Sequence, residues 1–293
     1  MLSNVVIKNY NGYALYISEF KDLNSFLQAI TDENINDIFI NKFASVNGSF
    51  NFTQTSSFKE AWDLCRFSWD DGFDNFYNLF RKVNYIFAKD YVTERDFLPV
   101  GYLPNIPRYL KGIPTSMYAY KKAEATKVLN IYMQIGYNCY QTKEQIINRG
   151  ILTLNLINYL ESNSIKVNFL LISASIENNE IAMIKIPLKN IHERLNLKKC
   201  YFPIVHPSFL RRLCFRAKEL MPLIDDGWAS GYGRSLRFKD VDDILEHESF
   251  NTDYIYISTP EELNIYGENL LDDLENFITS LNNDYGLEKK LKL

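Results

Sequence analysis

The chain has 293 residues, a formal net charge of −4 and a hydrophobic content of 46%. Such a chain is long enough and apolar enough to bury a large core, which excludes an intrinsically disordered protein. The acidic balance gives no global attraction for phosphate backbones, so any contact with nucleic acid would need a local basic patch.

No run of about 18 apolar residues occurs in the sequence, so no segment is expected to span a membrane. The N-terminus also lacks the basic segment, apolar core and small-residue cleavage site of a signal peptide. We therefore expect a cytoplasmic protein that makes no membrane contact.

The first part of the chain, residues 1–120, predicts a mainly helical region with one small hairpin. Two short β-prone runs flank Asn11 and Gly12, a pair that favours a type I′ hairpin turn. Helices are expected after Asp22 and after Ser57, because both residues can cap a helix N-terminus and apolar residues follow each at helical spacing.

A proline-rich segment, residues 97–117, closes this region. It holds four prolines and two glycines. Prolines remove backbone donors and disfavour helix at the preceding residues, so the segment predicts an ordered loop or a crossing between domains. We place the boundary at its end, which gives domains of residues 1–120 and 121–293.

The second region alternates strands and helices, the pattern of an α/β sheet. A strand at 127–137 precedes a helix at 142–163, with Thr142 as the expected N-cap and apolar residues around most of the helix, which should therefore be largely buried. Strands at 165–176 and 180–188 are only three residues apart. Because three residues cannot make a parallel crossover, these two strands should form an antiparallel hairpin.

A helix at 206–221, a strand at 252–260 and a helix at 261–284 complete the predicted elements. The first of these helices should bury its apolar side and expose four cations: Arg211, Arg212, Arg216 and Lys218. These side chains could grip phosphates or a carboxylate-bearing partner, or could simply form a solvated helix face. Arg108, in the proline-rich segment, is a weaker version of the same idea. A second basic patch is the terminal "LEKKLKL".

The order strand, helix, strand, tight antiparallel strand, helix, strand, helix resembles the opening of a von Willebrand factor A-type domain. In that fold the third strand runs antiparallel at an edge of an otherwise parallel, Rossmann-like sheet. The resemblance covers roughly Thr126 to the C-terminus. It implies a mostly parallel sheet with one antiparallel strand.

Four motifs, "SFKEAWDLCRFSWDDG", "PNIPRYLKGIPTSM", "RGILTLNLINYLES" and "HPSFLRRLCF", are together similar to a family of uncharacterised proteins encoded by bacteriophages and mobile elements. Some members are described as carrying an A-type domain. The similarity implies a phage or mobile-element origin, hence the host cell cytoplasm, and implies no activity.

The turn "GYNCYQT" after the first strand of the second region is where an α/β sheet usually binds its ligand. A metal-binding A-type domain would carry Asp-x-Ser-x-Ser there, to coordinate Mg²⁺ through one carboxylate and two hydroxyls. Asn138 and Thr142 offer only neutral oxygens, which bind Mg²⁺ poorly because the ion dehydrates reluctantly. We expect a degenerate metal site and no cofactor.

Other candidate chemistries are weakly supported. The three histidines are isolated in sequence and the four cysteines include no C-x-x-C pair, which argues against zinc. His206 precedes Pro207 at a helix start, where its ring could cap the helix, pack, or face a cleft. The loop "GWASGYGRS" lacks the spacing of a phosphate-binding P-loop and predicts a flexible surface loop.

The sequence therefore favours a non-enzymatic interaction protein with a protein partner, and nucleic acid as a possible partner through a local basic patch. The alternative is a nuclease-like, metal-dependent enzyme, for which "SWDDGFDN", "LIDDGW" and "KDVDDILEHE" could supply carboxylates. No catalytic residue is assigned. The candidate binding residues are Asn138, Thr142, His206, Arg211, Arg212, Arg216 and Arg108.

Overall fold

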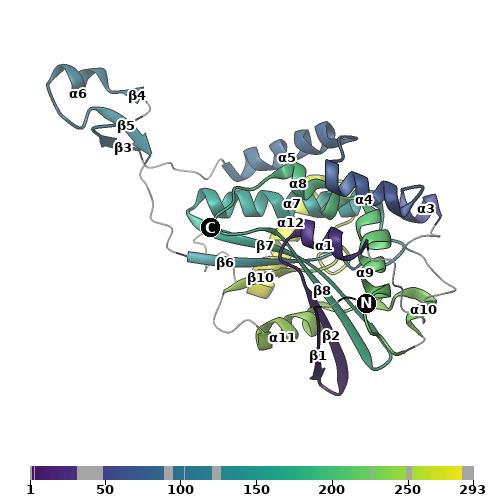
Figure 1. Ribbon diagram of the computed structural model, residues 1–293. Helices are drawn as coiled ribbons and strands as arrows, with labels where there is room; N and C mark the ends of the chain where they lie inside the picture. The colour runs from purple at the N-terminus through teal and green to yellow at the C-terminus, as the bar shows by residue number, and fades with distance from the viewer. Residues whose placement is uncertain are drawn as a thin grey trace.

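A computed structural model describes residues 2, 4–31, 49–88, 95–101, 103–120, 127–225, 227–248 and 253–285. Its main body is built on a seven-stranded mixed sheet of order β1-β2-β8-β7-β6-β10, with β9 also paired to β7 (Figure 1). The expected α/β class is confirmed. The strands are β1 (Val5–Tyr10), β2 (Tyr13–Glu19), β6 (Lys127–Gln134), β7 (Ile165–Glu177), β8 (Glu180–Lys189), β9 (Arg234–Ser235) and β10 (Tyr254–Ile257).

The centre of the sheet combines parallel pairs with one antiparallel hairpin. β6 runs parallel to both β7 and β10. β7 turns back into antiparallel β8 through Asn178 and Asn179, and Asn178 has a φ of 46°, as a tight turn requires. The predicted hairpin is confirmed. β7 extends beyond the end of β6, and there β9 takes over as its partner.

The N-terminal hairpin adds two strands to this sheet. Asn11 and Gly12 have φ angles of 51° and 87°, the positive values that a type I′ turn needs, so this prediction is confirmed. β2 runs parallel to β8 and covers its free side, so β8 is not the edge strand that the resemblance implied. The sheet thus joins residues from both sides of the division expected at residue 120.

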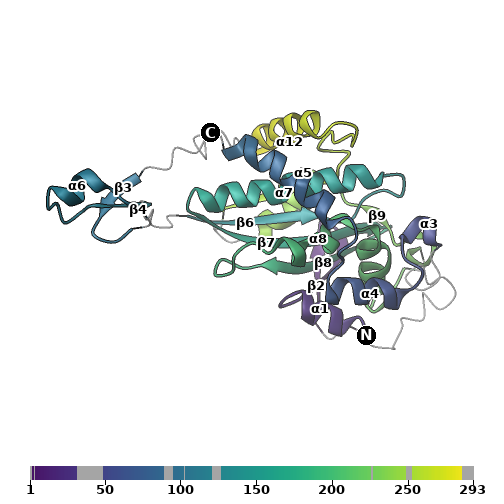
Figure 2. The ribbon, with the colours of Figure 1, turned by 90° about the horizontal axis from the view of Figure 1, so that it is seen from above.

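Helices cover the two faces unequally (Figures 1 and 2). α11 packs on one face, through Val241, Ile244 and Leu245. The remaining large helices lie on the other face, and α7 crosses its centre. The helices of the main body are α1 (Leu23–Ala29), α3 (Phe50–Thr53), α4 (Phe58–Phe67), α5 (Phe73–Ala88), α7 (Lys143–Ser162), α8 (Leu197–Val205), the π-helix η2 (Phe209–Cys214), α9 (Phe215–Glu219), α10 (Trp228–Gly231), α11 (Phe238–Glu248) and α12 (Leu270–Tyr285).

α7 begins where the sequence predicts. The Thr142 hydroxyl accepts a hydrogen bond from the backbone N–H of Gln145, and the Gln145 side chain accepts one from the N–H of Thr142, which completes a capping box. Most of the helix is buried, as its apolar sequence indicates. Each fully buried Leu or Ile contributes about 1.5–3 kcal/mol of transfer free energy, so packing rather than helix propensity holds α7 in place.

The proline-rich segment forms most of a small lobe, residues 95–120, apart from the main body in Figures 1 and 2. It contains a three-stranded sheet of order β3-β5-β4 and one short helix. The elements are β3 (Arg95–Leu98), β4 (Leu103–Pro104), α6 (Ile106–Leu110) and β5 (Met117–Tyr120). The expected ordered segment therefore has secondary structure of its own. Among the described residues, no helix has the length and apolarity to cross a membrane.

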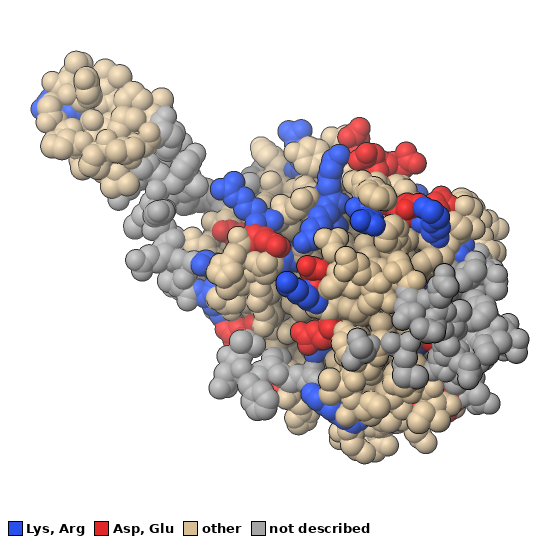
Figure 3. Space-filling view, in the orientation of Figure 1, with Lys and Arg blue, Asp and Glu red and all other residues tan. Residues whose placement is uncertain are grey.

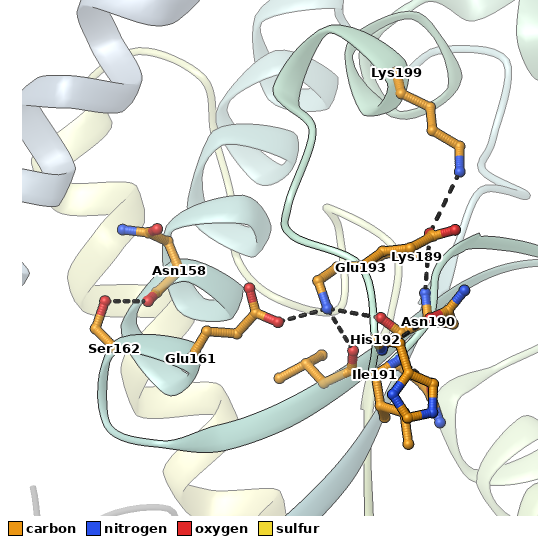
Figure 4. A network of polar contacts seen from close by, with 11 residues as sticks. Asn158, Glu161, Ser162, Lys189, Asn190, Ile191, His192, Glu193 and Lys199 are labelled. Carbon is orange, nitrogen blue, oxygen red and sulfur yellow. Dashed lines mark hydrogen bonds and ion pairs between the residues drawn. The ribbon is translucent and has the colours of Figure 1, made fainter. Parts of the chain in front are cut away.

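A buried lysine, Lys189, lies at the end of the sheet where β8 ends and β7 begins (Figure 4). The Lys189 ammonium donates to the carbonyl oxygens of Val167 and Asn190, at 2.8 and 3.0 Å, and pairs with the Glu161 carboxylate at 2.5 Å. An ammonium has three hydrogens to donate, and three acceptors surround this one. We call these residues the Lys189 network.

Candidate functional site

A cavity of about 400 Å³ lies at the carboxyl end of β6, the position at which α/β sheets usually bind ligands. Its walls come from the loop after β6, the end of β7, α3, the η2–α9 segment and the turn between α10 and β9. We call it the β6 cavity. Its lining residues are Phe52, Gly136, Tyr137, Asn138, Cys139, Ser175, Leu210, Arg211, Phe215, Lys218, Gly231, Tyr232, Gly233, Arg234 and Ser235.

A side chain from β6 fixes the geometry of this end of the sheet. The Gln134 amide donates to the carbonyl of Ala174 and accepts from the N–H of Ala174, both at 3.1 Å, so it continues the ladder where β6 leaves the sheet. Ser235 donates its hydroxyl to the carbonyl of Gly136 at 2.8 Å. The loop that opens the cavity is therefore tied to both β7 and β9.

Lys218, on α9, is a buried cation at the cavity wall. Its ammonium donates to the Ser175 hydroxyl at 2.7 Å and to the carbonyl of Tyr232 at 3.2 Å. Only 2% of the residue is exposed, and burial lowers its pKa from 10.5 to about 8. These two acceptors carry no charge and take two of the three ammonium hydrogens. The Phe215 and Trp228 rings lie 5.6 and 6.0 Å from the same ammonium.

Arg211, on the π-helix η2, is the second buried cation at this wall. Its guanidinium donates to the carbonyl oxygens of Phe52 at 2.6 Å and Cys139 at 3.1 Å. The Phe52 ring lies against it, 4.3 Å from Cζ to the ring centre. A guanidinium has five N–H donors, so this residue keeps donors beyond the two that bind its neighbours.

None of the described residues that line the β6 cavity is Asp or Glu, whereas Arg211, Lys218 and Arg234 all line it. The cavity is therefore positively charged in a protein of net negative charge. A neighbouring hollow of about 530 Å³ shares Asn138, Arg234 and Ser235 with it and has mixed charge, since Arg237, Asp240, Glu261 and Glu262 line it as well.

The predicted exposure of four cations is wrong. Arg211 is 6% exposed, Arg212 0%, Arg216 7% and Lys218 2%. The sequence pattern indicated an amphipathic helix with a solvated face. Instead, residues 52–55 and Ile30 contact the three arginines, and Ser175 and Tyr232 contact Lys218. Arg212 donates to Thr53 and Thr55, and Arg216 donates to the Ile30 carbonyl and pairs with Glu219, so both hold the N-terminal region against α9 and η2.

His206 caps and packs, one of the roles that its position suggested. Its Nδ1 accepts a hydrogen bond from the N–H of Ser208 at 3.1 Å. The ring stacks on Phe202 at 4.6 Å and meets the edge of Trp69 at 4.6 Å. Burial lowers the pKa of His206 from 6.5 to about 4, so the ring is neutral at physiological pH. It does not line the β6 cavity.

The remaining candidate residues divide between the cavity and other regions. Asn138 lines the β6 cavity and donates to the Glu261 carboxylate at 2.8 Å. Thr142 caps α7 and does not line the cavity. Arg108 lies in the small lobe, where it donates to Thr115 and covers the Phe97 ring. The structure therefore brings Asn138 and Arg211 together and leaves the others apart.

Two features of the site were not expected. The segment "GWASGYGRS" is not a surface loop, because Trp228 is 0% and Tyr232 4% exposed and the segment forms one cavity wall. Gly233, with a φ of 76°, lies so close to Trp228 that a Cβ there would be 2.7 Å from the indole ring, which only glycine avoids.

The described carboxylates of the acidic clusters do not gather into a metal site. Among the described residues, no group of three or more His, Cys, Asp or Glu side chains is placed to hold a metal ion. The terminal patch "LEKKLKL" lies outside the described residues.

Comparison with known proteins gives a family and no further match. Searches for similar curated proteins and for similar solved structures found none. A family model described as a domain of unknown function, DUF7192, matches residues 5–288, which include both the N-terminal hairpin and the β6 cavity. The chain belongs to this family.

Proposed function

We propose that this chain is a non-enzymatic binding protein whose β6 cavity receives an anionic group presented by a protein partner. One observation carries the proposal: two buried cations, Lys218 and Arg211, line one cavity and donate only to neutral oxygens in the hydrogen bonds described above. A buried charge without a counter-charge is costly, and an anion entering the cavity would remove that cost.

The form of the site favours a protein over nucleic acid. A nucleic-acid backbone is bound by rows of exposed Lys and Arg that neutralise successive phosphates. Here the donors are recessed and converge on one hollow, which suits a single carboxylate or other anionic side chain. On the face shown in Figure 3, basic and acidic side chains of the main body are interspersed and form no continuous basic field.

We also propose that the sheet is of the von Willebrand factor A type, with a degenerate metal site. The order β8-β7-β6-β10, with β8 antiparallel to β7, supports this assignment. Asn138 and Thr142, at the position of the metal-binding motif, are both engaged in hydrogen bonds within the protein. Titration with Mg²⁺ should leave the melting temperature unchanged, whereas a rise that grows with concentration would contradict the degenerate site.

The binding proposal is tested by thermal melting in sodium acetate against sodium chloride of equal ionic strength. Acetate should raise the melting temperature of the wild-type protein, because an anion that binds only the folded state stabilises it by mass action. The rise should disappear in Lys218→Met. It should persist in Lys59→Met, a control that removes an exposed lysine. No rise in the wild type, or an equal rise in Lys218→Met, would refute the proposal.

A further inference from the structure

Arg149, on α7, is a fully buried arginine whose donors are mostly unused. It is 0% exposed, and its Nη1 donates to the carbonyl of Ser258 at 2.9 Å. Its Nε and Nη2 have no hydrogen-bond partner in the described structure. Buried polar groups are nearly always paired, so an arginine with two idle nitrogens indicates a missing acceptor.

Among the residues that the structure describes, no carboxylate forms an ion pair with Arg149. The groups that act on its pKa electrostatically are the phenols of Tyr137 and Tyr256. Burial raises the pKa of Tyr137 to about 12, so that phenol is neutral at physiological pH. A buried charge without a counter-charge costs folding free energy, so folding alone gives little reason for an arginine here.

Tyr137 connects this arginine to the β6 cavity. The Cζ atom of Arg149 lies 5.9 Å from the centre of the Tyr137 ring, and the Cζ atom of Arg211 lies 5.7 Å from the centre of the same ring. Tyr137 is partly exposed and lines the cavity, whereas Arg149 does not. The two guanidinium groups therefore lie close to the same aromatic ring, and that ring lines the cavity.

Together Arg149, Arg211 and Lys218 make three cations at one end of the sheet. A carboxylate brings one negative charge and two oxygens. A phosphate monoester brings about −1.5 to −2 charges at pH 7 and three acceptor oxygens, which match a guanidinium fork. Given the proposed function, on which this inference rests, we propose that the bound group is a phosphorylated side chain, and that Arg149 anchors it once the Tyr137 ring turns aside.

The experiment compares inorganic phosphate, a phosphoserine peptide and its unphosphorylated form, each with acetate at equal ionic strength. In the wild type, phosphate and the phosphopeptide should raise the melting temperature more than acetate does. In Arg149→Met this advantage should vanish, with the phosphopeptide Kd on the order of tenfold or more weaker, while the acetate response remains. Arg149→Lys, which keeps the charge but loses the fork, should give an intermediate Kd.

The ligand-free melting temperature separates this role from a structural one. If Arg149 waits for a ligand, Arg149→Met should melt at or above the wild-type temperature without phosphate. A large drop, restored in Arg149→Lys with an unchanged phosphate preference, would assign Arg149 to folding and overturn the inference. Tyr137→Ala should speed association of the phosphopeptide, and an unchanged rate would rule out the turning ring.

The outcomes distinguish this inference from the proposed function. If acetate and phosphate stabilise the wild type equally, the phosphate assignment fails and the anion-binding cavity stands. If neither anion stabilises it, both fail. Stabilisation by inorganic phosphate without any gain from the phosphopeptide over its unphosphorylated form would exclude a phosphorylated side chain as the ligand.

Discussion

Two buried lysines lie at opposite ends of the same sheet, and they differ in the acceptors that surround the ammonium group. Lys189 has a carboxylate partner, Glu161, and two carbonyl acceptors. Lys218 has a hydroxyl and a carbonyl acceptor, and it faces a cavity. Both side chains are almost wholly buried. Among the described residues, the first lysine has a carboxylate partner and the second has none.

The difference separates a buried charge that the protein itself pairs from one that a ligand could pair. Burial alone does not distinguish the two kinds of charge, because each end of the sheet contains a buried cation. The number of hydrogen-bond acceptors around each cation does distinguish them. A cation whose donors all have acceptors gains nothing from a ligand, whereas a cation with an unused donor does. By the same count of acceptors, Arg149 resembles Lys218 rather than Lys189.

The largest effect is expected from removing Lys189, the lysine that has a carboxylate partner. Lys189→Met should lower the free energy of unfolding by about 2–3 kcal/mol, because the change leaves the Glu161 carboxylate and two carbonyls without their donor. The Glu161 side chain is 26% exposed, which keeps the penalty below that of a fully buried partner. Urea denaturation with and without the substitution measures it. A loss under about 1 kcal/mol would show that the Lys189 network is only a surface ion pair.

A smaller effect should come from titrating Lys218, the lysine that faces the cavity. Above pH 8 the folded protein releases the Lys218 proton, while the unfolded chain keeps it until about pH 10.5. The unfolded state then binds more protons, so the free energy of unfolding should rise with pH, by about 1–2 kcal/mol between pH 8 and 9.5. The rise is measured as the difference between the wild type and Lys218→Met. A difference that stays flat would place the Lys218 pKa outside this range.

The smallest effect is expected from Lys218→Met at pH 7. Two hydrogen bonds are lost, but a buried charge without a counter-charge is removed, so the free energy of unfolding should stay within about 1 kcal/mol of the wild type. Urea denaturation of Lys218→Met and of Lys189→Met under the same conditions measures the two effects for comparison. Equal losses in the two variants would mean that the two ends of the sheet do not differ.

Sequence signals that act over a few residues were reliable. The Asn11-Gly12 turn, the Thr142 cap and the tight turn at Asn178 were predicted because each depends on the conformation of adjacent residues. The β6 cavity lies at the carboxyl end of the first strand of the predicted α/β region, the position at which the sequence indicated that a ligand site should be sought. Asn138 was a candidate on these grounds, whereas Arg211 was a candidate as an exposed helix cation, and its burial was not predicted.

Burial of the long cations could not be predicted in the same way. The helical pattern around Arg212 indicates which side chains share a face, but its acceptors at Thr53 and Thr55 are more than 150 residues away in the chain. No local signal distinguished Lys218 from its neighbours. Arg149 did carry one, because a charged residue inside a helix expected to be buried all round is unusual.

The contacts of Arg212 also bear on how the protein is made. Its Nε and the Thr55 hydroxyl are 2.8 Å apart across a separation of 157 residues, and Arg211 reaches Phe52 across 159. Contacts of such sequence separation form late, because a long loop must close before they stabilise anything. On the ribosome, residues 50–55 must therefore wait until η2 has emerged. The side of the β6 cavity formed by Phe52 and Arg211 therefore cannot be complete before η2 has been synthesised.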